Sequence, residues 1–360
     1  MRVSVTLGLI GLAAFGGPAA HVALMRRELV ERREWVTAHD FSRMFAACNL
    51  VPGPSSTELA ILLGYRLAGW PGLLLGGAFF IAPAMAIMLG LAVLYQRFSD
   101  TRQLQAVLYG VRPVVVAIIA WAALDLARRL LEDRRFLLLV PVAIAFFVLG
   151  LNPVFILALV GLLGTVLFRW RRAGASLVGF VGADHPERLP VLFLTFLKIG
   201  SVSFGSGYVL FAFLHADFVQ SLHWLQPKQL VDAVAIGQVT PGPVFTTATF
   251  LGYLFAGIPG ALLATLAIFL PAFALVPFLD RVVRLVDQHR VLRLFLDAVN
   301  AAVIGLIIVV GFEIARSSLV DGLTVGLAVL VFPLILWRPL AAPIAVFAGA
   351  GAGLLTVLIR

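Results

Sequence analysis

Charge and cysteine are both scarce in this sequence. Charged residues make up 12% of its 360 residues, whereas ordinary domains contain about 25%. This scarcity excludes a water-soluble protein with a polar shell, and a hydrophobic content of 61% excludes intrinsic disorder. The single cysteine, Cys48, excludes an internal disulfide and any metal site built from several cysteines.

Signals of catalysis and of ATP use are also missing. The sequence has no G-x-x-x-x-G-K-[ST] loop, and His185 and His289 lie in basic segments without a suitably spaced partner. We therefore expect no enzyme, no cofactor and no metal site. The net charge of +9 does not indicate nucleic-acid binding here, because basic residues outside membrane spans chiefly reflect topology.

Long apolar segments are what the sequence does contain. A membrane span needs about 20 predominantly apolar residues, and 3–25, 70–96 and 104–127 each satisfy this requirement. Segment 136–168 is too long for one crossing and contains Asn152-Pro153 near its middle. We expect two short spans there.

The chain also contains two copies of one module. Gly, Pro, Phe, Trp and Tyr residues of the first copy recur in the second. The spacing between matched residues is 189 positions in the first part of the module and 188 positions in the rest of it. The matched pairs include Gly11/Gly200, Phe15/Phe204, Gly16/Gly205, Trp35/Trp224, Pro52/Pro241, Gly53/Gly242, Pro54/Pro243, Gly64/Gly252, Tyr65/Tyr253, Gly69/Gly257, Gly72/Gly260 and Pro83/Pro271. We therefore predict a first repeat at 1–170, a basic connecting loop at 171–189 and a second repeat at 190–360.

The basic residues of the short loops predict that the repeats are inverted. Arg and Lys accumulate on the cytoplasmic side, and loops rich in them in one copy are poor in them in the other. The loops compared carry Arg26, Arg27, Arg32 and Arg33 against Lys228, and Arg97 and Arg102 against Arg281, Arg284, Arg290 and Arg293. The two repeats are inverted only if segment 40–66, which is broken at Pro52–Pro54, enters and leaves the membrane by the same face. The fold class expected is an all-α polytopic membrane protein with two inverted-topology repeats and re-entrant helices broken at Pro-Gly-Pro motifs.

Inverted repeats with interrupted helices are typical of secondary transporters, and non-helical backbone at membrane depth lies inside the protein. A helix start supplies free N–H groups and the positive end of a dipole, which together favour an oxyanion. The expected substrate-binding residues are Pro52, Gly53, Pro54, Ser55, Ser56 and Thr57 in the first repeat, and Pro241, Gly242, Pro243, Thr246 and Thr247 in the second. The alternative is that both motifs are structural kinks with locally satisfied hydroxyls.

Further candidates flank these motifs. Gly16-Gly17, Gly205 and Gly207 would let a helix unwind toward the substrate, or simply allow close helix packing. Lys198 would neutralise part of an anion's charge or extend to the membrane surface.

Ionisable groups inside spans are costly and therefore suggest function. Glu58 is the candidate proton carrier, since its charge would oppose an anion unless it were protonated. His21 is a candidate relay or a packed, hydrogen-bonded histidine. Asn49 and Gln238 are candidates for donating to substrate or for capping broken backbone.

These motifs together resemble the chromate ion transporter family in its long two-domain form. The first-domain features are Phe15-Gly-Gly-Pro, His21, Glu28, Trp35, Leu50-Val-Pro-Gly-Pro54 and Gly64-Tyr65. The second-domain features are Phe204-Gly-Ser-Gly-Tyr208, Trp224, Gly237-Gln-Val-Thr-Pro-Gly-Pro243, Thr246-Thr-Ala-Thr-Phe250 and Ile268-Phe-Leu-Pro271. Ser206 departs from the family, which more often has Gly there.

The resemblance implies export of chromate from the cytoplasm, driven by the proton motive force and conferring chromate resistance. Sulfate, an isosteric dianion, is the implied competitor or alternative substrate. The expected location is the bacterial inner membrane, and the expected partners are the anion, protons, the lipid bilayer and a second copy of the chain. The remaining alternatives are a sulfate or other anion transporter of the same fold and a non-transporting membrane sensor, against which the absence of a soluble signalling domain argues.

Overall fold

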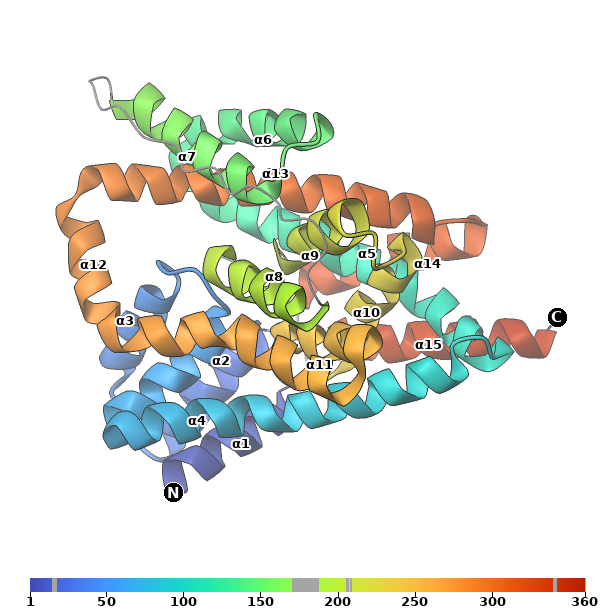
Figure 1. The fold of residues 1–360 in the computed structure, drawn as a ribbon, viewed down its shortest axis with the longest axis horizontal. Helices are drawn as coiled ribbons and strands as arrows, with labels where there is room; N and C mark the ends of the chain where they lie inside the picture. The colour runs from blue at the N-terminus through green and yellow to red at the C-terminus, as the bar shows by residue number, and fades with distance from the viewer. Residues whose placement is uncertain (15–17, 170–187, 205–206, 208, 339–341, 360) are drawn as a thin grey trace.

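The computed structural model describes residues 1–14, 18–169, 188–204, 207, 209–338 and 342–359. Every regular element in these residues is a helix (Figure 1). Four of the described helices are long and apolar enough to cross a membrane, and large apolar side chains such as Trp70, Leu266 and Trp337 are exposed on the outside. The structure confirms an all-α polytopic membrane protein.

The two repeats contain corresponding helices. Those of the first repeat are α1 (Arg2–Ala13), α2 (Pro18–Arg26), the π-helix η1 (Arg27–Arg32), α3 (Ala38–Cys48), α4 (Ser55–Phe98), α5 (Arg102–Leu130), η2 (Leu131–Leu138), α6 (Leu139–Val148) and α7 (Pro153–Arg169). Those of the second are α8 (Arg188–Val202), α9 (Val209–Leu214), the π-helix η3 (His215–Ser221), α10 (Pro227–Val239), η4 (Val244–Thr246), α11 (Thr247–Leu275), η5 (Val276–Phe278), α12 (Leu279–Gln288), α13 (Arg290–Ser318), α14 (Gly322–Trp337) and α15 (Ala342–Ile359).

The predicted interruptions are present. Segment 40–66 is broken between the end of α3 at Cys48 and the start of α4 at Ser55, and 136–168 forms the two short helices α6 and α7. The expected span 3–25 is divided between α1 and α2. Helix α2 begins at Pro18, and proline suits a first helical position because its missing N–H has no partner to lose there.

Helices α4 and α11 each fold back on themselves. Non-helical backbone occurs at Ala68-Gly69 in α4 and at the equivalent Ala256-Gly257 in α11, with Gly69 and Gly257 at φ of 62° and 61°. In α4 the arms meet so closely that a Cβ on Gly72 would lie 2.0 Å from the Gly64 carbonyl oxygen. The second arm of α4 therefore packs back against the end of the first arm.

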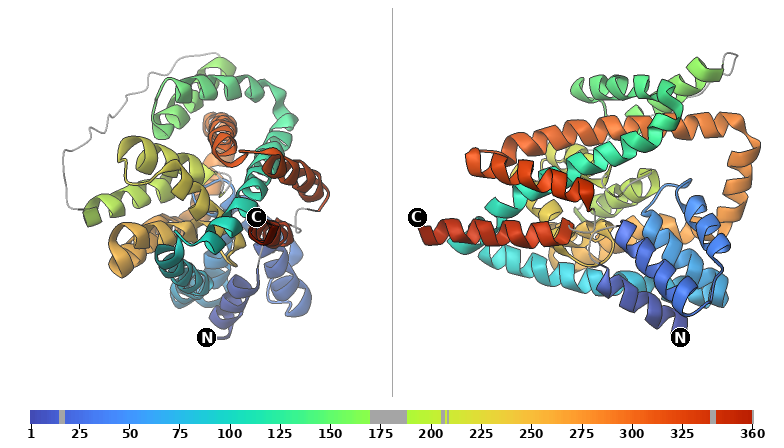
Figure 2. Two further views of the ribbon diagram at one scale, coloured as in Figure 1. Left: turned by 90° about the vertical axis from the view of Figure 1, so that its right-hand side faces the viewer. Right: turned by 180° about the vertical axis from the view of Figure 1, so that it is seen from behind.

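The repeats are intertwined through their last two helices. Helices α14 and α15 of the second repeat pack against α5 of the first, while α6 and α7 of the first pack against α13 of the second (Figure 2). Glycines permit these contacts: a Cβ on Gly110 would lie 1.9 Å from the Gly349 carbonyl oxygen. Small residues allow helix backbones to approach in this way in membranes.

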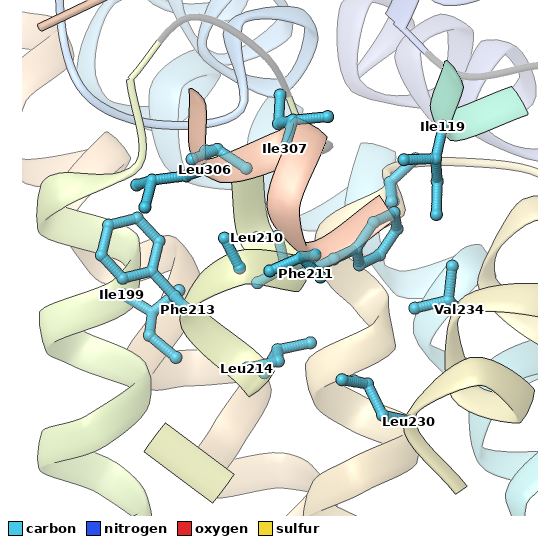
Figure 3. Packing of buried hydrophobic residues seen from close by; sticks show 14 of the residues in the cluster. Ile119, Ile199, Leu210, Phe211, Phe213, Leu214, Leu230, Val234, Leu306 and Ile307 are labelled. Carbon is cyan, nitrogen blue, oxygen red and sulfur yellow. The ribbon is translucent and has the colours of Figure 1, made fainter. Parts of the chain in front are cut away.

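The larger apolar core draws on both repeats. Around the short helix α9, Leu210 and Phe213 pack with Ile199 of α8 and with Leu306 and Ile307 of α13 (Figure 3). Neither repeat thus forms a separate packed body within the described chain. The broken helices are held inside this shared core.

Candidate substrate site

The two Pro-Gly-Pro motifs exchange hydrogen bonds with the broken helices of the opposite repeat. The Gly53 N–H donates to the Ser203 carbonyl oxygen at 2.7 Å, and the Gly242 N–H donates to the Ala14 carbonyl oxygen at 3.1 Å. Donor and acceptor positions both differ by 189 residues between the two bonds. The repeats therefore meet about a pseudo-twofold axis that passes between the motifs.

The central glycine of each motif has a backbone conformation that other residues rarely adopt. Gly53 lies at φ 142° and Gly242 at φ 97°. A Cβ would also meet a neighbour, 2.3 Å from Glu58 Oε1 at Gly53 and 2.5 Å from the Ala84 Cβ at Gly242. Glycine occupies both positions because a side chain would strain the backbone there and would collide with these neighbours.

In the first repeat the motif opens directly into a helix. Pro54 precedes the first turn of α4, and its carbonyl accepts from the N–H groups of Thr57 and Glu58 at 2.7 and 3.0 Å. The N–H groups of Ser55 and Ser56 precede the first intrahelical bonds and so remain available, as at any helix start. This end of α4 has the free N–H groups and the helix dipole that the sequence analysis expects of an oxyanion receptor.

Polar side chains are buried at this helix start. Ser56, Thr57, Glu58 and His21 are each at most 2% exposed. His21 Nδ1 shares a hydrogen bond of 3.1 Å with Ser56 Oγ, and its ring lies edge-on to Phe80. His21 is thus packed and hydrogen-bonded, and its contact with Ser56 places it beside the helix start.

Several of these buried groups have no hydrogen-bond partner among the described residues. They are both carboxyl oxygens of Glu58, Thr57 Oγ1 and His21 Nε2. Burial of a polar group without a partner costs about 1–3 kcal/mol by protein measurements, so native structures rarely leave several together. Unpaired donors and acceptors gathered at a helix start indicate a place where a ligand and a proton bind.

The second repeat differs at the same positions. Val244 and Phe245 stand where the first repeat has Ser55 and Ser56, and Leu210, within the apolar packing of Figure 3, stands where it has His21. Thr246 and Thr247 direct their hydroxyls to the carbonyls of Pro243 and Val244, both at 2.7 Å. The site is therefore asymmetric, with its free polar groups on the first repeat.

The remaining candidates are placed as follows. Asn49 donates to the Phe45 carbonyl at 3.0 Å and so caps its own helix, whereas Gln238 is buried with Nε2 unpaired. Lys198 forms an ion pair of 2.6 Å with Asp217. Gly207 is buried beside Val244. Gly16, Gly17 and Gly205 lie outside the described residues.

A buried ionic network on α5 and α10 escapes prediction from the sequence. Arg112 Nε donates to Asp232 Oδ1 at 2.8 Å, and the Tyr95 hydroxyl donates to Asp232 Oδ2 at 2.9 Å. Asp232 is 1% exposed. Two signals were available in the sequence. Asp232 is a lone carboxylate in an apolar segment, and Arg112 is an arginine within a membrane span, so each requires a partner of opposite charge.

Within the described chain, no group of three or more His, Cys, Asp or Glu side chains could hold a metal ion.

Comparison with known proteins identifies the family. The sequence profile of the chromate transporter family matches residues 1–165 and 191–354. The chain is 34% identical to a chromate transport protein of Cupriavidus metallidurans, covering 96% of this chain and 90% of that protein. It is 31% identical to a probable chromate transport protein of Synechococcus elongatus, covering 96% and 93%, and 32% identical to a chromate transport protein of Pseudomonas aeruginosa, covering 89% and 82%. No solved structure matches the chain. With matches along nearly its whole length, this chain belongs to the chromate transporter family.

Proposed function

We propose that this protein exports chromate from the cytoplasm across the bacterial inner membrane, driven by the proton motive force, and thereby confers chromate resistance. The observation that carries the proposal is the buried helix start at Ser55–Glu58, where the Thr57 hydroxyl and both carboxyl oxygens of Glu58 have no partner among the described residues. A tetrahedral dianion fits the chemistry of this helix start: N–H groups, hydroxyls and a helix dipole. Sulfate has the same shape and charge and is the expected competitor.

Glu58 is the proposed proton carrier. Its carboxyl group is buried, folds back over Gly53 and has no cationic partner among the described residues. An isolated carboxylate is costly in such surroundings, and a neighbouring dianion would repel it. Anion and proton therefore bind together, with the proton on Glu58.

The direction of transport follows from the charge moved. A dianion that leaves with one proton carries one net negative charge outward, which releases about 2.3 kcal/mol per 100 mV of an inside-negative potential. Moving the proton toward an acidic exterior costs about 1.4 kcal/mol per pH unit, the energy of a tenfold concentration ratio. At 100 mV, export remains favourable up to a gradient of roughly 1.6 pH units.

Chromate uptake into inside-out vesicles tests this proposal. Uptake should require energisation, stop when valinomycin and potassium remove the potential, and persist or rise when nigericin removes only the pH gradient. Sulfate should compete. Glu58→Gln, a neutral substitute of the same size, should retain uptake but lose its pH dependence. Uptake that survives full uncoupling would refute the proton motive force as the driving energy.

Cross-linking in native membranes tests the expected homodimer, which should give a species of twice the mass of the chain. The proposed site lies within one chain and does not depend on that outcome.

A further inference from the structure

A charged cavity opens near the proposed site. It measures about 680 Å³ and lies between α3, α4 and α12, which pack together at one end of the molecule (Figure 1). Arg43 and Arg66 of the first repeat and Arg284 of the second line it. This end carries the basic loops predicted to be cytoplasmic.

Two of these three arginines have no acidic partner in the described part of the chain. Arg66 forms an ion pair of 2.5 Å with Asp280, but no carboxylate lies within salt-bridge distance of Arg43 or Arg284. Two further acidic side chains, Asp287 and Asp40, line the cavity. Asp287 pairs with Arg293 at 3.0 Å, and Asp40 accepts a hydrogen bond of 2.8 Å from the Thr37 hydroxyl at the start of its own helix.

The cavity extends toward Glu58. Its lining includes Ala47 and Leu62. Ala47 lies next to the last residue of α3, and Leu62 lies one helical turn after Glu58. The lining of the cavity on α4 thus ends about one helical turn, roughly 5 Å, from Glu58 along the helix.

The equivalent positions of the other repeat lack these arginines. Asp232 stands 189 positions after Arg43, Leu254 stands 188 positions after Arg66, and Gln96 stands 188 positions before Arg284. Asp232 is bound to Arg112 and Tyr95.

We propose that Arg43 and Arg284 form a capture site for free tetrahedral oxyanion dianions at the mouth of the route to the buried helix start. The two guanidinium groups come from different repeats and face one cavity, which suits a ligand with two charges and four acceptor oxygens. The site deepens the proposed function and rests on it for direction. Anions are collected at the basic end by two arginines that the equivalent positions of the other repeat lack.

Substitution of the two arginines tests the capture site. The variants are Arg43→Gln, Arg284→Gln and the double variant, with Arg281→Gln as control, because Arg281 is an exposed arginine of the same helix α12 that does not line the cavity. Each arginine would supply hydrogen bonds to a charged ligand, and solvent exposure of Arg43 and Arg284 weakens them. Each single variant should weaken chromate binding roughly tenfold, and the control should not weaken it.

Two measurements separate binding from transport. Equilibrium binding to purified protein in detergent is followed through quenching of Trp35, which lines the cavity, because chromate absorbs where tryptophan emits; Trp35→Phe identifies that signal. In inside-out vesicles, KM for chromate should rise while the maximal rate is retained, since the buried site is intact.

The possible outcomes are distinct. Unchanged affinity in the double variant, or an equal loss in Arg281→Gln, would overturn the capture site. Loss of a co-purifying anionic lipid with unchanged chromate affinity would assign the arginines to a lipid headgroup and would also overturn it. If the wild type binds chromate through these arginines but accumulates none in energised vesicles, the export proposal fails and the capture site stands.

Discussion

Gly242 is the position where the structure gives the sharpest energetic prediction. Replacing it by alanine forces a φ of 97° on an L-residue, at a cost of about 1–2 kcal/mol. The new Cβ would lie 2.5 Å from the Ala84 Cβ, and overpacking of this kind costs about 1–3 kcal/mol. Gly242→Ala should therefore destabilise the protein by about 2–5 kcal/mol and abolish transport.

Matched variants separate the two contributions. Gly90 has no positive φ, and a Cβ added there would meet nothing within 4 Å, so Gly90→Ala should be neutral or slightly stabilising. Gly69 lies at φ 62° and also has nothing within 4 Å, so Gly69→Ala should show backbone strain alone. Ala84→Gly removes the atom that clashes. Combined with Gly242→Ala, it should destabilise less than the sum of the single changes.

Unfolding of purified protein in detergent, followed by intrinsic fluorescence, measures this series. The expected order of stability is Gly90→Ala, then Gly69→Ala, then Gly242→Ala. Strict additivity of the Ala84 and Gly242 changes, or a Gly242→Ala protein as stable as Gly90→Ala, would contradict the close approach of the two repeats at this motif.

The remaining predictions concern the ionic network and the connection between repeats. Asp232→Asn should destabilise by about 3–5 kcal/mol because it leaves Arg112 buried without a counter-charge, and Tyr95→Phe should cost only about 1 kcal/mol for one hydrogen bond; equal effects in denaturant titrations would contradict the network. Cutting the chain within 171–187 and co-expressing both halves should restore transport, since the contacts between repeats form through packed helices, whereas either half alone should be inactive; uptake by a single half would refute the shared site.

The sequence predicted the helices, the repeat and the broken motifs because these depend on features that side chains display. Proline and glycine close together disfavour a helix, and two matched Pro-Gly-Pro motifs locate both breaks. The helix start at Ser55–Glu58 followed from the same reasoning. Inversion of the repeats and the residue roles stay predictions that the proposed experiments test.

What the sequence could not reveal depends on contacts between the repeats. The acceptors of the motif bonds are the carbonyls of Ser203 and Ala14, and a backbone carbonyl has no residue-type signature. Arg112 matched Asn300 by position, yet its partner is Asp232 on another helix. Lys198 was a candidate for binding the anion, but an ion pair with Asp217 engages it. Such pairings follow from how the repeats intertwine, which no local pattern encodes.

The crossed motif bonds have a consequence for how the protein is made. The acceptor for the Gly53 N–H is Ser203, which the ribosome adds about 150 residues later, after roughly 8–30 s at ordinary synthesis rates. Throughout that time the first motif waits with an unpaired peptide group that hydrocarbon does not tolerate. This peptide group therefore needs water or protein around it until the second half arrives, on the same chain or on a separate one. Both motifs are completed only when the two halves meet.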